Sequence, residues 1–387
     1  MSTLSQGQIV ERLIELEQSL PICDLALGDM ELWPIIRHKT YQQTRRKPTY
    51  TGNRPPPKTD SFQLPPALAT GDVPAIPTRQ AQLQGLGGDR PLDLMMLSRA
   101  ELHTERVKGG LFDRLGDSVL LTAIAEGLAV AKLEVLFQQP PPGGLPRRHI
   151  EPALSLPNGP FAQVPLPADL ALNGPTAPVE AVQQALGVTL NIQEIGQLAV
   201  MIWQIAESWK PVLAKAKPRA VILQCYYYPA GFGLTYACNQ LGIPVVELQH
   251  GQQGQTHLMY TNWPVQPPGG FKLRPSHFWV WGKPTAGHMR WPSAPDDQQP
   301  QIVVGGNPWM SLWRAGAKAA ATAPVQQVAA KVADAKGRGG SCILLALQPS
   351  GTPIAEHVLQ VMKAQPGAFW LVRLHPHQFG WRDQAVR

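Results

Sequence analysis

The sequence predicts an α/β protein with two domains, each built around a parallel sheet. Its 387 residues suggest two domains at roughly 150 residues each. From residue 190 onward, short apolar runs alternate with stretches of helical spacing, which is the pattern of strand–helix–strand crossovers. The run 343–347 is apolar throughout, as expected for a strand that is buried on both faces of a parallel sheet.

The first ninety residues predict helices followed by a basic, proline-rich linker. Helical spacing covers residues 5–18 and about 28–46. The stretch 48–91 carries nine prolines and little periodicity, which predicts an extended connection. Seven basic residues and no acidic one lie in the segment 37–58, and they equal the whole formal net charge of +7.

This basic segment, residues 37–58, is interpreted as a solvated linker. Its functional alternative is attraction to an anionic membrane surface or to a charged glycan. Nucleic acid is disfavoured, because only Tyr41 and Tyr50 could supply the aromatic rings of a stacking platform. We therefore expect no nucleic acid partner.

Strands and helices also alternate along the first predicted domain, residues 91–270. A buried strand is expected at 92–97, a helix at about 118–129 and a further apolar segment at 133–137. The stretch 140–178 then holds eleven prolines. It predicts a second long connection within this domain.

The clearest local signal is a strand–helix–strand unit between residues 220 and 248. The apolar run 220–225 predicts a strand, and Pro229 then opens a helix at the position where proline is tolerated. Gly242 ends that helix, because glycine adopts a left-handed cap without strain. The next strand is expected at 243–248, as in a parallel crossover.

The same alternation continues to the end of the chain. Further helices are expected at 191–214, 308–316, 324–336 and 353–364, and further strands at 277–281, 301–305, 342–347 and 369–374. The proline- and glycine-rich stretch 263–275 is the predicted boundary between the two sheets. The predicted parts are therefore N-terminal helices with the linker (1–90), a first domain (91–270) and a second domain (271–387).

Nothing in the sequence predicts secretion or a membrane span. Residues 1–20 carry three glutamates among apolar residues, unlike a signal peptide. The longest apolar stretch, 119–131, is too short for a bilayer and contains Glu126. The four cysteines lack close pair spacing, which indicates reduced thiols. We predict a cytoplasmic protein that could make peripheral contact with the inner face of the inner membrane.

Candidate site residues follow the predicted strands, where parallel sheets bind their ligands. Gln249, His250 and Gly251 come directly after the strand 243–248. His250 is either a site residue or a histidine that caps a turn. Glu247, inside the apolar strand, is either a buried paired carboxylate or a catalytic base with a raised pKa.

Two motifs of the second domain could hold a phosphate. Arg373, His375 and His377 alternate along a strand end and would share one face. A metal pair is the alternative, but no Cys, Asp or Glu lies at ligand spacing, so we expect neither metal nor cofactor. The segment 348–352 is similar to an anion-binding turn that leads into a helix.

A charged loop after the strand 92–97 supplies two further carboxylates, Glu101 and Asp113. Either could provide the base that activates an acceptor hydroxyl. The alternative is a solvated, ion-paired loop. Neither the glycine-rich dinucleotide fingerprint nor the P-loop pattern occurs where it would be needed, which disfavours ATPase and dinucleotide-dependent activities.

The order of short motifs resembles that of bacterial capsule and lipopolysaccharide glycosyltransferases with two Rossmann-like domains, the GT-B type. These motifs are Glu247-Leu-Gln-His-Gly251, His257-Leu-Met-Tyr260, Phe278-Trp-Val-Trp-Gly282, Gly306-Asn-Pro308 and Arg373-Leu-His-Pro376. The pattern is similar to the Kdo- and sialic-acid-transferring enzymes, in which a His-Pro pair contacts the phosphate of a CMP-activated sugar. The resemblance covers roughly residues 200–376.

The resemblance implies transfer of a sugar from a nucleotide-activated donor, CMP-Kdo-like or another nucleotide sugar, to a glycan or lipid-linked acceptor of a growing cell-surface polysaccharide. It implies donor-binding roles for Gly306, Asn307, Gln348, Ser350, Gly351, Arg373, His375 and Pro376. Residues expected to line the cleft are Gln249, Gly251, His257 and Tyr260. The candidates for catalysis are His250, Glu247, Asp113 and Glu101.

Eleven residues follow Pro376, whereas the family's second domain continues further, so we expect an incomplete second domain. Two other functions stay open. One is another activity of the same fold, such as a sugar-nucleotide epimerase or a glycerophosphate-type polymerase. The other is a non-catalytic basic protein that binds or scaffolds.

Overall fold

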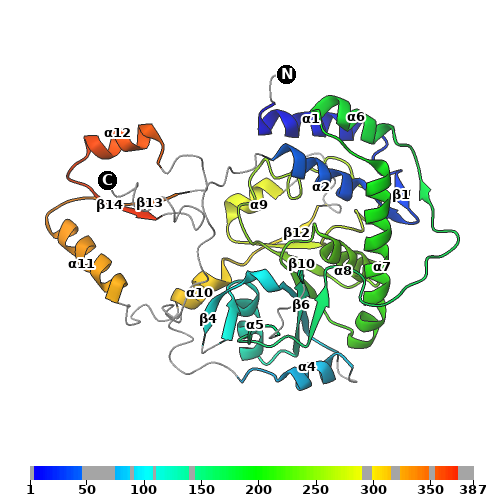
Figure 1. Cartoon of the computed structure of the whole chain (residues 1–387), viewed down its shortest axis with the longest axis horizontal. Coiled ribbons are helices and arrows are strands. Elements are labelled where there is room, and N and C mark those ends of the chain that lie inside the picture. The colour runs from blue at the N-terminus through cyan, green and yellow to red at the C-terminus, as the bar shows by residue number, and fades with distance from the viewer. Residues whose placement is uncertain are drawn as a thin grey trace. The chain divides into compact units, whose positions relative to one another are not determined.

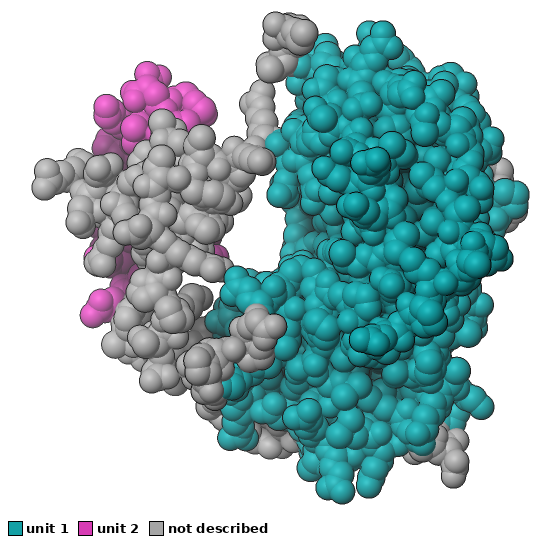
Figure 2. Space-filling view, turned by 45° about the vertical axis from the view of Figure 1, so that its right-hand side comes forward, with its two compact units in different colours: residues 1–45, 64–317 teal, residues 46–63, 318–387 magenta. Residues whose placement is uncertain are grey.

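The computed structural model describes residues 4–45, 75–87, 91–107, 110–138, 144–289, 299–314, 323–347 and 354–373. The chain divides into two compact units, coloured separately in Figure 2. The first comprises Met1–Arg45 with Leu64–Ala317, and the second comprises Arg46–Gln63 with Lys318–Arg387. Each unit has its own parallel sheet, as the sequence predicts.

The first unit is built on a seven-stranded sheet in which every neighbouring pair is parallel. Its strand order is β12-β11-β10-β9-β3-β6-β7. In chain order the strands are β3 (Leu94–Arg99), β6 (Val130–Leu136), β7 (Leu154–Pro157), β9 (Val221–Leu223), β10 (Val245–Leu248), β11 (His277–Val280) and β12 (Gln301–Val304). The predicted α/β class with a parallel sheet is confirmed.

Alternating side chains of the strands serve two hydrophobic cores, one on each face of the sheet. Met95 and Leu97 of β3 belong to the larger core, whereas Leu94 and Met96 belong to the smaller one. Helices that contribute to the larger core are α1 (Gln6–Ser19), α2 (Trp33–Thr44), α6 (Ala177–Leu186), α7 (Ile192–Ala216) and α8 (Pro229–Gln240) (Figure 1). The smaller core includes residues of α5 (Gly116–Ala125), α10 (Pro308–Arg314) and the hairpin β4 (His103–Val107) and β5 (Gly110–Asp113).

Helix α7 is the long helix predicted at 191–214. The side chain of Asn191 caps it by accepting from the N–H groups of Gln193 and Glu194, at 2.9 and 3.4 Å. Helix α8 packs closely against it, because a Cβ on Gly233 would lie only 2.3 Å from Cγ2 of Ile205. This close contact holds α8 against the main core.

The second predicted N-terminal helix begins later than expected. Two short strands, β1 (Ala26–Leu27) and β2 (Met30–Glu31), come first. β1 lies between β2 and β8 (Leu172–Asn173) and pairs with both in a small antiparallel sheet. Helix α2 then starts at Trp33, with Pro34 in its first turn. Because α1 packs on α6 and α2 packs on α7, these helices are part of the first unit rather than a separate N-terminal region.

Arg37 of α2 is a core residue and not part of a solvated linker. Its side chain is fully buried, and its Nε lies 2.8 Å from Oε1 of Glu17. The guanidinium also donates to the carbonyls of Thr261 and Asn262 and lies 4.1 Å over the ring of Trp263. Burial of a charge requires such pairing. The predicted basic segment therefore begins in the core, and its residues from 46 onward lie outside the described residues.

The first sheet extends beyond the boundary that the sequence predicts. Strand β11 pairs with β10, and β12 pairs with β11, so both lie in the first unit. The stretch 263–275 packs into the main core through Trp263, Phe271 and Leu273, which are at most 3% exposed. Its prolines and glycines belong to a packed crossover, and the division between the units falls after Ala317.

The second unit contains a strand–helix–strand pattern, as predicted. Strands β13 (Cys342–Ala346) and β14 (Phe369–Arg373) pair in parallel, from Cys342 opposite Phe369 to Ala346 opposite Arg373. Its helices are α11 (Ala323–Gly337) and α12 (Glu356–Ala364). The other elements of the described residues, all in the first unit, are α4 (Arg79–Gly85), η1 (Ala100–Leu102) and α9 (Lys283–Met289).

Among the described residues, no helix has the length and apolar character needed to cross a membrane. The four cysteines, Cys23, Cys225, Cys238 and Cys342, are all free thiols in the structure.

Candidate functional site

Glu247 occupies a row of leucines in the middle of the sheet. The strand registers pair Leu97 with Leu223, and Leu223 with Glu247, so the three residues lie side by side on β3, β9 and β10. Side chains in one row point to the same face, here the face of the larger core. A carboxyl group therefore stands where the neighbouring strands place an apolar side chain, and it is 1% exposed.

Two groups hold the Glu247 carboxyl. The backbone N–H of Tyr226 donates to Oε2 at 3.2 Å, and the hydroxyl of Tyr260 donates to Oε1. Burial raises the pKa of Glu247 to about 8, although the hydrogen bond from Tyr260 acts in the opposite direction. The carboxyl is therefore largely protonated at neutral pH.

His250 lies three residues further along, just past the end of β10, and partly reaches the surface. Its Nδ1 is 3.6 Å from Oε1 of Glu247, and its side chain is 22% exposed. Nδ1 itself is buried and has no hydrogen-bond partner within the described residues. Burial, assisted by the charge of Arg99, lowers the pKa of His250 to about 4, so its imidazole is neutral at physiological pH.

A chain of hydroxyl groups connects Glu247 with a second histidine. The hydroxyl oxygens of Tyr260 and Tyr227 lie 3.3 Å apart, and the Tyr227 hydroxyl lies 3.4 Å from Nε2 of His257. The His257 ring stacks on Tyr41 of α2, with ring centres 4.3 Å apart. Burial lowers the pKa of His257 to about 3, so this ring is neutral as well. The chain thus joins polar groups that are all uncharged at neutral pH.

The backbone turns sharply at Cys225, between β9 and the three tyrosines that follow it. Its φ of 71° is left-handed, which is strained for a residue other than glycine. Burial raises the pKa of the Cys225 thiol to about 12, so the thiol stays protonated and is a poor nucleophile. Gly231 permits the turn, because a Cβ there would lie 2.6 Å from the carbonyl oxygen of Tyr226. The strained turn therefore serves to position Tyr226 and the tyrosines after it, and the Cys225 thiol itself is not reactive.

Glu101, the first of the two loop carboxylates that the sequence singles out, is an ion-pair partner near the surface. Its Oε1 lies 3.1 Å from Nε of Arg99, and its side chain is 42% exposed. Arg99 in turn is the last residue of β3. The structure thus places Glu101 in the ion-paired loop that the sequence left as the alternative.

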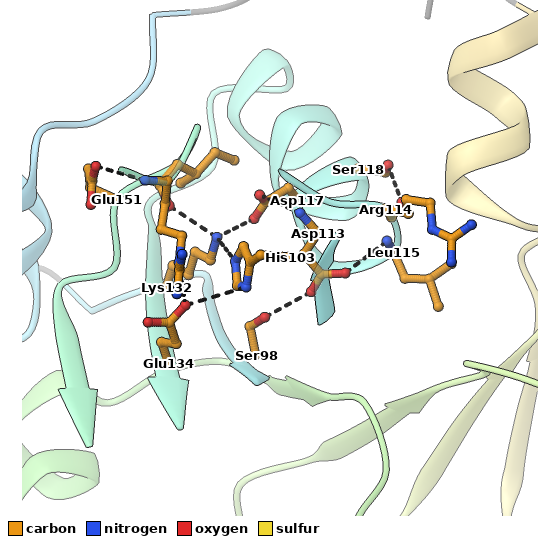
Figure 3. A network of polar contacts seen from close by, with 12 residues as sticks. Ser98, His103, Asp113, Arg114, Leu115, Asp117, Ser118, Lys132, Glu134 and Glu151 are labelled. Atoms are coloured by element: carbon orange, nitrogen blue, oxygen red, sulfur yellow. Dashed lines mark hydrogen bonds and ion pairs between the residues drawn. The ribbon is translucent and has the colours of Figure 1, made fainter. Parts of the chain in front are cut away.

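Asp113, the second loop carboxylate, lies beside Ser98 (Figure 3). Its contacts place it on the opposite face of the sheet from Glu247. It accepts from the hydroxyl of Ser98 at 2.8 Å, from the side-chain amide of Gln224 at 2.5 Å and from the N–H of Leu115 at 3.0 Å. Ser98 and Gln224 follow residues of the main core by one position, so they point to the other face. The structure therefore does not bring Asp113 together with Glu247 and His250.

Sequence reasoning missed a buried ionic network on that second face (Figure 3). Lys132 Nζ donates to Asp117 Oδ1 at 2.5 Å and to the Ile150 carbonyl at 3.0 Å, and it lies 2.9 Å from Nε2 of His103. Burial raises the pKa of Asp117 to about 6 and lowers that of His103 to about 2. The network is closed to solvent, since Lys132 and Asp117 are 0% exposed. It fixes the hairpin and α5 onto the sheet.

A second acid, Glu134 of β6, extends this network. Glu134 Oε1 accepts from Arg148 Nε at 2.7 Å and lies 3.4 Å from Nδ1 of His103. The sequence signal was the alternation of Lys132 and Glu134 within an apolar strand, because alternate residues share one face.

The predicted cleft residues Gln249 and Gly251 connect two strand ends. The Gln249 amide donates to the Gly251 carbonyl at 2.9 Å, and its oxygen accepts from the N–H of Trp281 at 2.7 Å. Both polar atoms of Gln249 are therefore engaged within the protein. These bonds fix the loop that carries His250.

Among the predicted donor-binding residues, Gly306 and Asn307 follow β12 in the first unit. The Gly306 carbonyl accepts from Nε1 of Trp279 at 2.9 Å. Asn307 Oδ1 accepts from the N–H groups of Trp309 and Met310, at 3.1 and 3.3 Å, and so caps α10. The sequence did not predict this capping role.

The other predicted donor residues belong to the second unit. Arg373 is exposed at the C-terminal end of β14. The remaining five lie outside the described residues: Gln348, Ser350, Gly351, His375 and Pro376. Within the part of the chain that is described, no three His, Cys, Asp or Glu side chains gather as metal ligands.

Comparison with known proteins yields no family. No family model matches the chain, and no curated protein matches it in sequence. One similar solved structure is "Crystal structure of UDP-GlcNAc 2-epimerase from Neisseria meningitidis bound to UDP-GlcNAc". It is 13% identical with a TM-score of 0.34, and the match covers 74% of this chain and 67% of that chain. At this similarity the match assigns no function to the chain.

Proposed function

We propose that the chain is a glycosyltransferase that uses a nucleotide-activated sugar. The observation that carries the proposal is the pair formed by His250 and Glu247 at the C-terminal end of a central parallel strand. His250 is neutral and partly exposed, and its buried Nδ1 faces a carboxyl. A neutral imidazole in this position can take a proton from a hydroxyl group. The order of motifs supports sugar transfer as the reaction that uses it.

In the proposed reaction, His250 is the base for an acceptor hydroxyl. The hydroxyl oxygen forms a bond to the anomeric carbon of the donor sugar, and the bond from that carbon to the donor phosphate oxygen breaks. The nucleotide leaves with the bonding electrons, and the hydroxyl proton moves to the imidazole. Glu247 then stabilises the imidazolium through Nδ1, 3.6 Å away, when its carboxyl is ionised.

The donor side of the proposal rests on the motif resemblance. We assign the donor phosphate to His375 and Pro376, and the nucleotide to Gln348, Ser350 and Gly351. The resemblance also implies donor-binding roles for Gly306 and Asn307 in the first unit and for Arg373 in the second. Asn307 would act through its amide nitrogen, since its oxygen caps α10.

The acceptor is proposed to be a glycan or a lipid-linked saccharide. The part of the basic segment from residue 46 onward would hold the enzyme near an anionic membrane surface, where lipid-linked acceptors are found.

A donor panel tests the proposal. Purified protein is incubated with CMP-Kdo, CMP-sialic acid and a set of UDP- and GDP-sugars, and both thermal shift and nucleotide release are followed. We expect a thermal shift and nucleotide release for one class of donor. No response to any donor would contradict the proposal, and an epimerised sugar-nucleotide product would indicate the alternative enzyme class.

Two variants connect the activity with the site. His250→Ala removes the base and should lower nucleotide release by about a hundredfold or more, as general-base loss does. The donor-induced thermal shift should remain, because His250 is proposed to contact the acceptor. His357→Ala, an exposed histidine of α12, is the matched control and should leave the rate unchanged.

A further inference from the structure

Arg99 ends β3 on the same face of the sheet as Glu247. Leu97 shares a row with Glu247 through Leu223, and Arg99 lies two residues further toward the C-terminal edge. Strand β9 alone separates β3 from β10, so the two strands are about 10 Å apart. The charge of Arg99 is one cause of the lowered pKa of His250, which agrees with their closeness.

The guanidinium of Arg99 pairs with a carboxylate near the surface. Its Nε faces Glu101 at 3.1 Å, and the side chains are 21% and 42% exposed. Because the Glu101 carboxylate is partly exposed, water screens the pair and a ligand anion can compete with Glu101. The guanidinium carbon lies 5.7 Å from the ring centre of Phe137 and 5.6 Å from that of Tyr228. These rings hold the cation in place without supplying a negative charge.

Tyr228 provides a second and independent sign of a ligand. Its side chain is 7% exposed, and its hydroxyl is buried without a hydrogen-bond partner among the described residues. An unsatisfied buried hydroxyl costs free energy, which a ligand oxygen would recover. Phe137 lies beside it, with ring centres 5.4 Å apart, and is 43% exposed. Its ring offers a flat apolar surface next to two polar groups.

We propose that Arg99, Tyr228 and Phe137 form a binding site for an anionic sugar, one that carries a carboxylate or a phosphate. Arg99 binds the anion, Tyr228 donates a hydrogen bond to it, and Phe137 packs against the sugar ring. The role of this sugar as the acceptor rests on the proposed function, whereas its binding does not. Bound there, a short saccharide spans the distance to β10 and brings a hydroxyl toward His250.

Equilibrium binding to the full chain, without any nucleotide sugar, tests the site. Calorimetry compares a glucuronate-terminated disaccharide, glucose 1-phosphate, an uncharged glucose disaccharide and inorganic phosphate. We expect one or both anionic sugars to bind. Comparing the affinities of the glucuronate-terminated disaccharide and glucose 1-phosphate shows whether the site prefers a carboxylate or a phosphate. Equal binding of the uncharged disaccharide would overturn the proposal. If inorganic phosphate binds as tightly as glucose 1-phosphate, the site recognises the phosphate alone, and the proposed contact with the sugar is wrong.

Three variants assign the binding to these residues. Arg99→Gln should weaken the anionic sugar by about tenfold or more, because it removes a charge-assisted hydrogen bond. Tyr228→Phe should weaken it while keeping the ring, and Glu101→Gln should tighten it by removing the competing carboxylate. Unchanged affinity in Arg99→Gln would overturn the proposal.

Arg219→Gln is the matched control. Arg219 precedes β9, at the opposite end of the sheet, and its side chain is 76% exposed in an ion pair with Asp93. Its replacement should leave the affinity unchanged. If Arg99→Gln fails to unfold cooperatively, the affinities of Tyr228→Phe and Glu101→Gln test the site instead. Wild-type affinity in both of these variants would overturn the proposal.

The two proposals fail separately. Anionic sugar binding that depends on Arg99, together with no nucleotide release from any donor, would keep this site and remove the transferase. Nucleotide release without binding of either anionic sugar would keep the transferase and remove this site.

Discussion

At the scale of single residues, the most unusual feature is a carboxyl in a row of leucines. Glu247 aligns with Leu97 and Leu223, and burial raises its pKa from 4.5 to about 8. The folded protein keeps a proton on Glu247 that the unfolded chain loses above its ordinary pKa. The stability contributed by this residue therefore falls as the pH rises from 4.5 to about 8.

Glu247→Gln removes this titration. The variant should gain stability relative to the wild type as the pH rises between the two pKa values, by up to about 1.4 kcal/mol per pH unit. Urea denaturation at a series of pH values measures the difference. Glu11→Gln, on the exposed side of α1, is the control and should run parallel to the wild type. A parallel curve for Glu247→Gln would mean that the carboxyl titrates normally.

Tyr260→Phe tests the contact that holds this carboxyl. Loss of the hydroxyl should lower the free energy of unfolding by about 1–3 kcal/mol, because a buried acceptor loses its donor. The loss should be greater above pH 8 than below it, since the hydrogen bond to an ionised carboxyl is stronger. The measurement below pH 8 serves as the internal comparison. An equal loss of unfolding free energy above and below pH 8 would mean that the Tyr260 hydrogen bond does not depend on the ionisation of Glu247.

Residues of the site differ in how far the sequence reveals them. Glu247 stands out because it interrupts an apolar run, and His250 because it follows a strand end. The pairing of Lys132 with Asp117 and His103 depends on the fold of a hairpin over the sheet, which no local pattern carries. The capping role of Asn307 could be predicted, because asparagine before a proline-initiated helix is a common start signal.

At the scale of elements, helix α2 shows how a basic sequence can serve the core. Arg37 pairs with Glu17 of α1, and the rings of Trp33 and Trp263 contact the pair. Burial raises the pKa of Glu17 to about 7, although the charge of Arg37 acts against this. The ion pair thus fixes α2 to α1.

Arg37→Met should therefore destabilise the protein. Removal of one partner of a buried ion pair leaves Glu17 without its cation, and the expected loss is about 3–5 kcal/mol. Thermal or urea unfolding measures it, with Lys39→Met on the same helix as the control of similar size and charge. A second change, Glu17→Gln, should recover part of the loss. If Arg37→Met and Lys39→Met cost the same, the ion pair contributes nothing particular.

Local signals predicted the crossover elements well. The expected strand, helix and strand between residues 220 and 248 correspond to β9, α8 and β10. They succeed because Pro229 and Gly242 mark helix ends by their own backbone preferences. The start of α2 was misplaced, because the two-residue strands β1 and β2 carry no periodicity of their own.

At the scale of the whole molecule, composition misplaced the division of the chain. The stretch 263–275 is rich in proline and glycine, yet it packs against the core and leads into β11. Composition alone does not distinguish a packed crossover from a linker. The first sheet needs β11, because Phe278 and Val280 are buried at 1% and 0% exposure.

This division predicts how fragments behave. A fragment of residues 1–317 should unfold cooperatively, because it holds all seven strands of the first sheet. A fragment that ends at residue 270 lacks β11 and β12 and exposes the edge of β10, so it should aggregate or unfold without cooperativity. Circular dichroism during heating distinguishes the two. Cooperative unfolding of the shorter fragment would restore the boundary at 263–275.

The central claim is that His250 accepts a proton with the help of Glu247. It is tested most directly by the pH dependence of nucleotide release in the wild type and in Glu247→Gln, with the donor that the panel identifies. The ionised carboxyl stabilises the imidazolium, so the wild-type rate should rise with pH through an apparent pKa near that of Glu247, about 8. Glu247→Gln should be slower and should lack this rise. A wild-type rate that does not change across this pH range, or a rise that persists in Glu247→Gln, would contradict the claim.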